Sequence, residues 1–118
     1  MQPITVYQKP TCSTCRNVIK LLETQKLPFT AINYYEKPFT TNLLTTLLKK
    51  GGLKALDVLR TKEEIYKTLN LRTEPRSEKE MIDLMVQHPD LIQRPLVEIG
   101  DTVILARPPE RLSTALKA

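Results

Sequence analysis

Hydrophobic residues in the first third of the chain follow two different periodicities. Residues 4–8, ITVYQ, are rich in β-branched and aromatic side chains and predict a short strand. From Thr11 to about Gln25, apolar residues recur at helical spacing. Pro28 interrupts that pattern, and residues 29–35, FTAINYY, predict a second strand. A strand, a helix and a strand in so short a segment predict a βαβ unit with parallel strands and a right-handed crossover.

The middle of the chain, about residues 40–88, carries helical patterns and no strand pattern. Apolar residues line one face of a first helix, which Gly51-Gly52 ends, and a short helical piece follows at about 53–59. Ser or Thr followed three residues later by Glu predicts a capping box at the start of a helix. Two segments have this spacing and predict two further helices, namely Thr61–Glu64 and Ser77–Glu80.

The end of the chain returns to strand patterns. Residues 94–99, RPLVEI, and 102–106, TVILA, flank Gly100-Asp101 and predict a tight hairpin. A short helix is expected at 110–116. The predicted order is β-α-β, helical insertion, β-β-α, which is an α/β fold with a small mixed sheet. We expect one domain, residues 1–118, with the helical insertion at about 40–88.

Composition narrows the classes of partner. The chain has 118 residues and a net charge of +5, from 18 Lys and Arg against 13 Asp and Glu. The basic residues are scattered, so we expect no nucleic-acid partner. A small anion remains one possible ligand. No apolar run reaches the roughly 20 residues of a membrane helix, so no membrane association is expected. The N-terminus lacks the pattern of a signal peptide, which predicts a cytoplasmic protein.

Both cysteines lie in a Cys-x-x-Cys motif, at Cys12 and Cys15. A zinc site needs four ligands, and the chain adds only His88 to the two thiols, so we predict no metal. A structural disulfide is disfavoured in a reducing compartment. Two inert buried thiols remain one interpretation. The position after a strand and at the start of a helix, inside a βαβ unit, favours a redox pair in a thioredoxin-like arrangement.

A helix N-terminus explains how one of these thiols would become reactive. Backbone N–H groups without internal partners and the helix dipole both stabilise a thiolate, so the pKa of Cys12 should be lowered. Arg16 adds positive charge nearby. Cys15 lies one turn further along and should be less exposed. Cys12 is therefore the predicted nucleophile, and Cys15 is a candidate resolving thiol. The same amides could hold a tetrahedral oxyanion.

Three arginines separated in sequence could complete an oxyanion site. Arg94 precedes Pro95 at the entry to the hairpin, and Arg107 follows the last strand. With Arg60, these residues stand at the ends of predicted elements that could meet the helix N-terminus near Cys12. Guanidinium groups bind planar or tetrahedral oxygen groups with two parallel hydrogen bonds. Together with the thiol motif, the three arginines therefore indicate a site that binds an oxyanion.

Four motifs together resemble one known family. They are PTCSTCRN at 10–17, LR at 59–60, MIDLMVQHPDLIQRPLV at 81–97 and ARPPE at 106–110. The chain is similar over nearly its whole length to the arsenate reductase (ArsC/Spx) family, of the type coupled to glutathione and glutaredoxin. The resemblance implies a thioredoxin-like fold with a helical insertion. It also implies a cis bond between Arg94 and Pro95, facing the active helix.

The resemblance further implies the chemistry. Cys12 would be the catalytic cysteine of an arsenate reductase, and Arg60, Arg94 and Arg107 would bind arsenate or a similar oxyanion. Cys12 would attack arsenic, glutathione would act as co-substrate, and glutaredoxin would resolve the mixed disulfide. The implied enzyme has no bound cofactor, and we expect a monomer.

Two departures from the reductase pattern leave two alternatives open. Gln8-Lys9-Pro10 stands where the reductases carry His-Asn-Pro, so Lys9 could supply charge instead of a histidine. Cys15 stands where they often carry serine. A Cys-x-x-Cys pair is typical of Spx-type regulators, which use it as a redox switch and bind RNA polymerase. It also fits a thiol oxidoreductase of the family with another substrate, in which Cys15 resolves Cys12 and thioredoxin replaces glutaredoxin.

Overall fold

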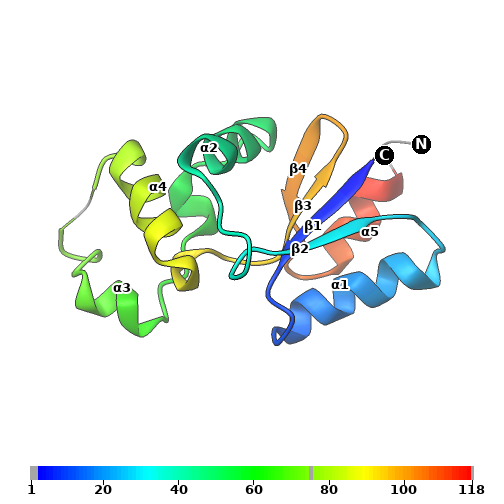
Figure 1. The fold of residues 1–118 in the computed structure, drawn as a ribbon, viewed down its shortest axis with the longest axis horizontal. Coiled ribbons are helices and arrows are strands. Elements are labelled where there is room, and N and C mark those ends of the chain that lie inside the picture. The colour runs from blue at the N-terminus through cyan, green and yellow to red at the C-terminus, as the bar shows by residue number, and fades with distance from the viewer. Residues whose placement is uncertain (1–2, 75, 118) are drawn as a thin grey trace. The chain divides into compact units, whose positions relative to one another are not determined.

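The computed structural model describes residues 3–74 and 76–117 and divides into two compact units. The first unit combines the two ends of the chain, Met1–Lys37 and Arg94–Ala118, and the second is Pro38–Gln93. The second unit contains the helical insertion expected at about 40–88. Figure 1 shows the elements of both, and the units are described in turn.

The first unit is built on a four-stranded sheet with the order β2-β1-β3-β4. Strand β1 (Ile4–Gln8) runs parallel to β2 (Thr30–Asn33) and antiparallel to β3 (Leu96–Ile99). Strand β4 (Thr102–Leu105) pairs antiparallel with β3, and Gly100 in the turn has φ of 55°. The predicted βαβ unit, hairpin and mixed sheet are confirmed.

The predicted second strand was too long at both ends. The backbone leaves the sheet after Asn33 because this residue builds a turn. Its Oδ1 accepts a hydrogen bond from the Tyr35 N–H at 3.0 Å, and its carbonyl oxygen accepts from Glu36 and Lys37. Tyr34 and Tyr35 therefore belong to the turn, and only residues 30–33 of the predicted 29–35 are in β2.

One hydrophobic core joins the sheet to helices α1 (Ser13–Thr24) and α5 (Glu110–Lys117). Val6 and its register partner Val97 share one face of the sheet, and both are fully buried. Helix α1 contributes Val18 and Leu22, three and seven residues after Cys15 on its buried face. Packing of this face fixes the position of the α1 N-terminus at the end of β1.

The second unit contains helices and 3₁₀ turns: α2 (Thr41–Lys50), η1 (Ala55–Val58), α3 (Glu64–Thr68), α4 (Glu78–Gln87) and η2 (Pro89–Leu91). Helix α2 packs against α4, where the Thr41 hydroxyl donates to Oδ1 of Asp83 at 3.3 Å. The Leu59–Ile92 bridge is antiparallel, with the Gln93 N–H donating to Val58 O at 2.7 Å. The 3₁₀ turn η2 after His88 was not predicted.

The two predicted capping boxes had opposite outcomes. The Ser77 hydroxyl accepts from the Glu80 N–H, and the Glu80 carboxylate accepts from the Ser77 N–H, so the second box is confirmed. The box at Thr61–Glu64 was wrong. Helix α3 begins only at Glu64, with Glu63 as N-cap and no side-chain cap, so Thr61 lies outside the first turn. The Glu63 carboxylate accepts from Arg60 instead.

The element order and the pairing of the strands confirm the predicted thioredoxin-like fold with a helical insertion. Within residues 3–74 and 76–117, no helix has the length and apolar character that crossing a membrane requires.

Candidate active site

Cys12 stands at the junction between sheet and helix. Strand β1 ends at Gln8, and a short loop closes when the Cys12 N–H donates to Lys9 O at 2.9 Å. Cys12 is the N-cap of α1 with an extended backbone, and its carbonyl accepts the first helical hydrogen bond, from Arg16, at 3.0 Å. The thiol is therefore held at the helix N-terminus, as predicted, and it is partly exposed.

Hydrogen bonds determine the charge of this thiol. Burial by itself raises the pKa of Cys12, but hydrogen bonds from the Cys15 backbone, the Cys15 thiol, Arg94 and Arg107 outweigh it. The net effect lowers the pKa from 9.0 to about 6. Cys12 is then mostly a thiolate at neutral pH, which is the form that attacks electrophiles.

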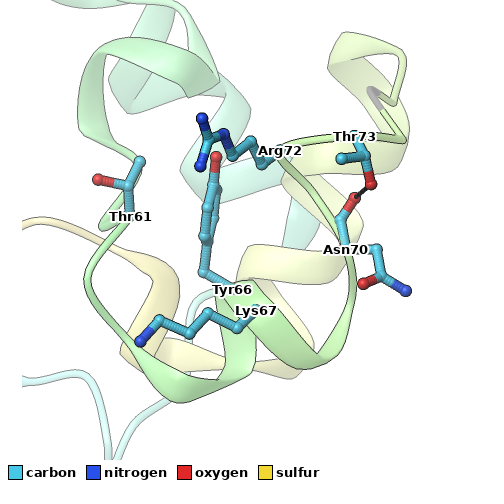
Figure 2. Close-up of a pocket in the computed structure, with 6 residues that line it drawn as sticks. All are labelled: Thr61, Tyr66, Lys67, Asn70, Arg72 and Thr73. Carbon is cyan, nitrogen blue, oxygen red and sulfur yellow. Dashed lines mark hydrogen bonds between the residues drawn. The ribbon is translucent and has the colours of Figure 1, made fainter.

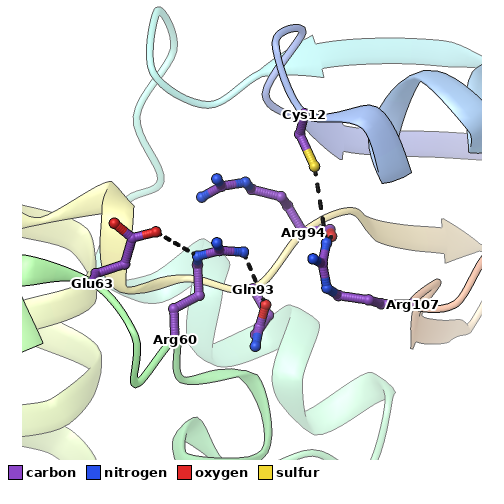
Figure 3. A network of polar contacts seen from close by, with 6 residues as sticks. All are labelled: Cys12, Arg60, Glu63, Gln93, Arg94 and Arg107. Atoms are coloured by element: carbon purple, nitrogen blue, oxygen red, sulfur yellow. Dashed lines mark hydrogen bonds and ion pairs between the residues drawn. The ribbon is translucent and has the colours of Figure 1, made fainter.

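The Arg107 guanidinium directly contacts the Cys12 sulfur. Its Nη1 donates to Sγ of Cys12 at 3.9 Å and to the carbonyl oxygen of Arg94 at 3.1 Å (Figure 3). The second bond ties the segment after β4 to the segment before β3, so the guanidinium is fixed beside the sulfur. A fixed positive charge at this distance stabilises the thiolate.

Arg94 is the only buried charged residue among those that the structure describes, with 7% of its surface exposed. Its Nε and Nη1 are buried and have no hydrogen-bond partner within the described chain. A buried guanidinium with unused donors is costly unless something binds to it. The bond between Arg94 and Pro95 is cis, the geometry that the resemblance implied, and the Arg107–Pro108 bond is also cis.

Cys15 is the electrostatic opposite of Cys12. Its side chain is fully buried, and burial is the main reason why its pKa rises from 9.0 to about 12. The neighbouring Cys12 adds to this increase, both by its charge and by accepting a hydrogen bond. Cys15 is therefore a protonated donor to the Cys12 thiolate at neutral pH, and solvent reaches only Cys12.

Arg16 and Lys9 contact the loop around the thiol. Arg16 Nη1 donates to the carbonyl oxygens of Thr11 at 3.0 Å and Pro10 at 3.4 Å, so its cation braces the loop that precedes Cys12. The Lys9 ammonium lies 4.8 Å from the centroid of the Tyr35 ring, a cation–π contact. Both cations remain close to the loop in the first unit.

Tyr34 is a site neighbour that the sequence pattern did not reveal. Its side chain is 1% exposed and its ring lies 5.0 Å from that of Tyr35. Burial by itself lowers the pKa of Arg94, but Tyr34 and Cys12 beside the guanidinium raise it above its usual value. The sequence pattern placed both tyrosines in a strand, and no short motif links residue 34 to residue 94.

Arg60 belongs to the second unit. Its Nε donates to Oε1 of Glu63 at 2.9 Å and its Nη1 to Oε1 of Gln93 at 3.1 Å, as Figure 3 also shows. Glu63 and Gln93 had not been recognised, although the three-residue spacing from Arg60 to Glu63 could have indicated the first pair. The structure thus groups Arg94 and Arg107 with Cys12, while the role of Arg60 at the oxyanion site stays a prediction.

The first unit therefore combines a thiolate, two guanidinium groups and helix N-terminal amides. This set can bind an oxyanion and bring a nucleophilic sulfur to it. Among the described residues, no group of three or more His, Cys, Asp or Glu side chains is arranged to hold a metal ion.

Known proteins share both the sequence and the fold. Residues 7–115 match the family model described as the ArsC family. An arsenate reductase of Haemophilus influenzae is 35% identical over 108 residues, covering 91% of this chain and 93% of that protein. An arsenate reductase of Escherichia coli K12 is 36% identical over 110 residues, covering 93% and 78%. The solved structure of an arsenate reductase from Vibrio cholerae superposes with a TM-score of 0.90 at 33% identity, covering 96% and 97% of the two chains.

Proposed function

Because this chain belongs to the ArsC family, we propose that it is an arsenate reductase, which reduces arsenate to arsenite through the Cys12 thiolate. The observation that carries the proposal is the thiolate at the α1 N-terminus, with a pKa of about 6, beside the guanidinium of Arg107. Arsenate is a tetrahedral anion, and these groups have the charge and geometry to receive it.

The first step is oxyanion binding. Arg94 offers Nε and Nη1, which lack partners among the described residues, and Arg107 offers a guanidinium next to the sulfur. Two cations offset the repulsion between a thiolate and an anion, which is the main electrostatic obstacle to the reaction. We assign Arg60 as the third arginine of this site. Its pairing with Glu63 would then exchange for a pairing with the substrate.

The chemical steps transfer two electrons from sulfur to arsenic. The Cys12 thiolate forms a bond to As(V), and one arsenate oxygen leaves as water after protonation. The thiolate of glutathione then attacks the Cys12 sulfur, and the electron pair of the S–As bond stays on arsenic. Arsenic leaves as As(III), arsenite, and Cys12 is left in a mixed disulfide with glutathione. A glutaredoxin thiolate takes over the glutathione and releases Cys12 by thiol–disulfide exchange.

Cys15 has a supporting role in this cycle. Its burial keeps external thiols away, and its raised pKa disfavours the thiolate that resolution of Cys12 would need. We therefore propose that Cys15 donates a hydrogen bond to the Cys12 thiolate. Recycling by glutathione requires a compartment with reduced thiols, so we propose that the enzyme is cytoplasmic. We also propose that it is a monomer without a bound cofactor.

A coupled assay tests the function. Purified protein with glutathione, glutaredoxin, glutathione reductase and NADPH should oxidise NADPH only when arsenate is added, and Cys12→Ser should abolish the signal. Cys15→Ser, which keeps a hydrogen-bond donor, is the matched variant and should retain most of the activity. Absence of arsenate-dependent turnover would rule out the proposal.

Mass spectrometry after mild oxidation separates the alternatives. A glutathione adduct on Cys12 with Cys15 free supports the glutaredoxin cycle. An intramolecular Cys12–Cys15 disulfide would instead indicate a thioredoxin-type oxidoreductase or an Spx-type switch. Binding to RNA polymerase by only one of the two redox forms would identify the switch.

A further inference from the structure

The second unit contains a cavity that the proposed reaction does not use. It has a volume of about 570 Å³, and its lining comes from α3 and the segments on either side of it (Figure 2). This volume lies within the range of roughly 300–1,000 Å³ that is usual for small-molecule sites. The lining residues are Thr61, Tyr66, Lys67, Asn70, Arg72 and Thr73.

The segment after α3 is folded back by a defined turn. Asn70 has a φ of 53°, in the left-handed region that asparagine tolerates better than most residues. The carbonyl oxygen of Asn70 accepts from the N–H groups of Thr73 at 3.2 Å and Glu74 at 2.8 Å, and from the Thr73 hydroxyl at 3.4 Å. Leu71, 5% exposed, anchors the turn in the interior. Residues 72 and 73 are thus held beside α3.

The charge of the cavity is positive. Lys67 and Arg72 line it, and no carboxylate is among its described lining residues. Neither the Lys67 ammonium nor the Arg72 guanidinium has an ion-pair or hydrogen-bond partner in the described part of the chain. The nearby carboxylates of Glu63 and Glu74 already face Arg60 and Arg76. Two unpaired cations in one hollow favour an anionic ligand.

The remaining lining groups suit an organic ligand rather than a bare ion. In Figure 2 the Tyr66 ring rises from α3 toward the guanidinium of Arg72, and Thr61 stands across from it. The half-buried ring offers an apolar surface, and the Thr61 and Thr73 hydroxyls offer hydrogen bonds. A ligand with an anionic end and a planar or apolar body would use all of these groups.

We propose that the cavity beside α3 binds a small organic anion, whose body rests on Tyr66 and whose phosphate or carboxylate group draws in the exposed side chains of Lys67 and Arg72, which Figure 2 shows at opposite ends of Tyr66. The site is separate in its residues from Cys12, Arg94 and Arg107, so its occupation does not require the reductase chemistry.

Amide-resolved NMR titration of the full chain tests this site. The probes are AMP and citrate at millimolar concentration, with adenosine as the uncharged counterpart of AMP. At least one anionic probe should shift the amide signals of residues 61 and 66–73, while adenosine should bind at least about tenfold more weakly than AMP. The tighter of the two anions assigns the anionic group as phosphate or carboxylate.

Matched variants distinguish a built site from general charge attraction. Lys67→Gln and Arg72→Gln should each weaken binding of the anionic probe about tenfold, and Tyr66→Leu should weaken binding of AMP. Lys20→Gln and Arg111→Gln remove exposed cations of the first unit and should leave the affinity for the probe unchanged. Equal weakening by these controls, equal binding of adenosine, or no shift with either anion overturns the proposal. Cys12→Ser should still bind the probe, which separates this test from that of the reductase.

Discussion

At the scale of single residues, two identical functional groups have opposite protonation states. Cys12 and Cys15 are one helical turn apart, yet the pKa of the first is lowered to about 6 and that of the second raised to about 12. For Cys12, hydrogen bonds outweigh burial, and for Cys15, burial outweighs the hydrogen bond from the Lys9 backbone. Only Cys12 can therefore act as a thiolate in neutral solution.

The pH dependence of alkylation measures this separation. The rate at which iodoacetamide modifies Cys12 should rise with a midpoint near pH 6 instead of 9.0, because the reagent reacts with the thiolate. In Cys12→Ser, the remaining thiol of Cys15 should stay unreactive through neutral pH, because burial, the main cause of its raised pKa, is unchanged and also keeps the reagent away. A midpoint near 9.0 for Cys12 would contradict the geometry of the site.

The same shift affects stability. The folded-state pKa of Cys12 lies below the unfolded value of 9.0, so the thiolate stabilises the fold fully above pH 9.0 and this contribution disappears as the pH falls through about 6. The difference in unfolding free energy between the protein and Cys12→Ser should therefore be largest above pH 9.0 and decrease as the pH falls toward about 6.

Substitution of Arg107 should affect both binding and protonation. Arg107→Gln removes a donor to the Cys12 sulfur. We expect kcat/KM for arsenate to fall about a hundredfold and the alkylation midpoint of Cys12 to move to higher pH. Arg111→Gln, which removes an exposed guanidinium from α5, is the control and should leave both measurements unchanged. An unchanged midpoint in Arg107→Gln would contradict the contact.

The sequence was sufficient for those site residues that short motifs identify. Cys12 follows a strand and begins a helix, so its location at a helix N-terminus could be predicted from local pattern alone. Tyr34 could not be predicted as a neighbour of Arg94, because only pairing of strands far apart in the chain brings these residues together. Gln93 was missed as a partner of Arg60 for a related reason, since the Leu59–Ile92 bridge brings these two distant residues together.

At the scale of elements, a capping sequence acts only where the helix begins. Thr61–Glu64 and Ser77–Glu80 have the same spacing, but only Ser77 occupies the N-cap position of a helix. In the first case, α3 starts three residues after Thr61, so the Thr61 hydroxyl does not lie at the helix N-terminus. The strands were easier to predict, since each has an apolar pattern bounded by turn residues such as Gly100.

The pair provides a matched stability test. Ser77→Ala should lower the unfolding free energy by about 1 kcal/mol, because it removes the hydroxyl that accepts from the Glu80 N–H. Thr61→Ala should lower it by less than about 0.5 kcal/mol, since Thr61 caps no helix. Urea denaturation of both variants measures the difference. Equal losses would mean that α3 begins before Glu64.

At the scale of the molecule, the helical unit is inserted between two strands of the sheet. Pro38–Gln93 follows β2 and precedes β3, so both of its ends connect to the first unit. Neither segment of the first unit, Met1–Lys37 or Arg94–Ala118, contains all four strands. The sheet can form only when residues on both sides of the insertion come together, which favours one cooperative unfolding transition for the predicted single domain 1–118.

A core substitution in one unit tests this expectation. Leu22→Ala in the core of the first unit should lower the free energy of unfolding by about 2–5 kcal/mol. Urea titration followed by amide NMR should then show the same lowered midpoint for signals of both units. Leu56→Ala, at a side chain that is 70% exposed, should leave the midpoint unchanged. An unshifted midpoint in Pro38–Gln93 alone would indicate two independent domains.

The bond between Arg107 and Arg94 separates two tasks at one position of the chain. Arg107 donates to the main-chain oxygen of residue 94, which every amino acid carries, while Nε and Nη1 of Arg94 are left to contact an anion. Side-chain replacement at 94 therefore removes no acceptor from Arg107. A replacement at position 94 should therefore change which anion is recognised, and with it the pKa of Cys12, while Arg107 keeps its main-chain anchor.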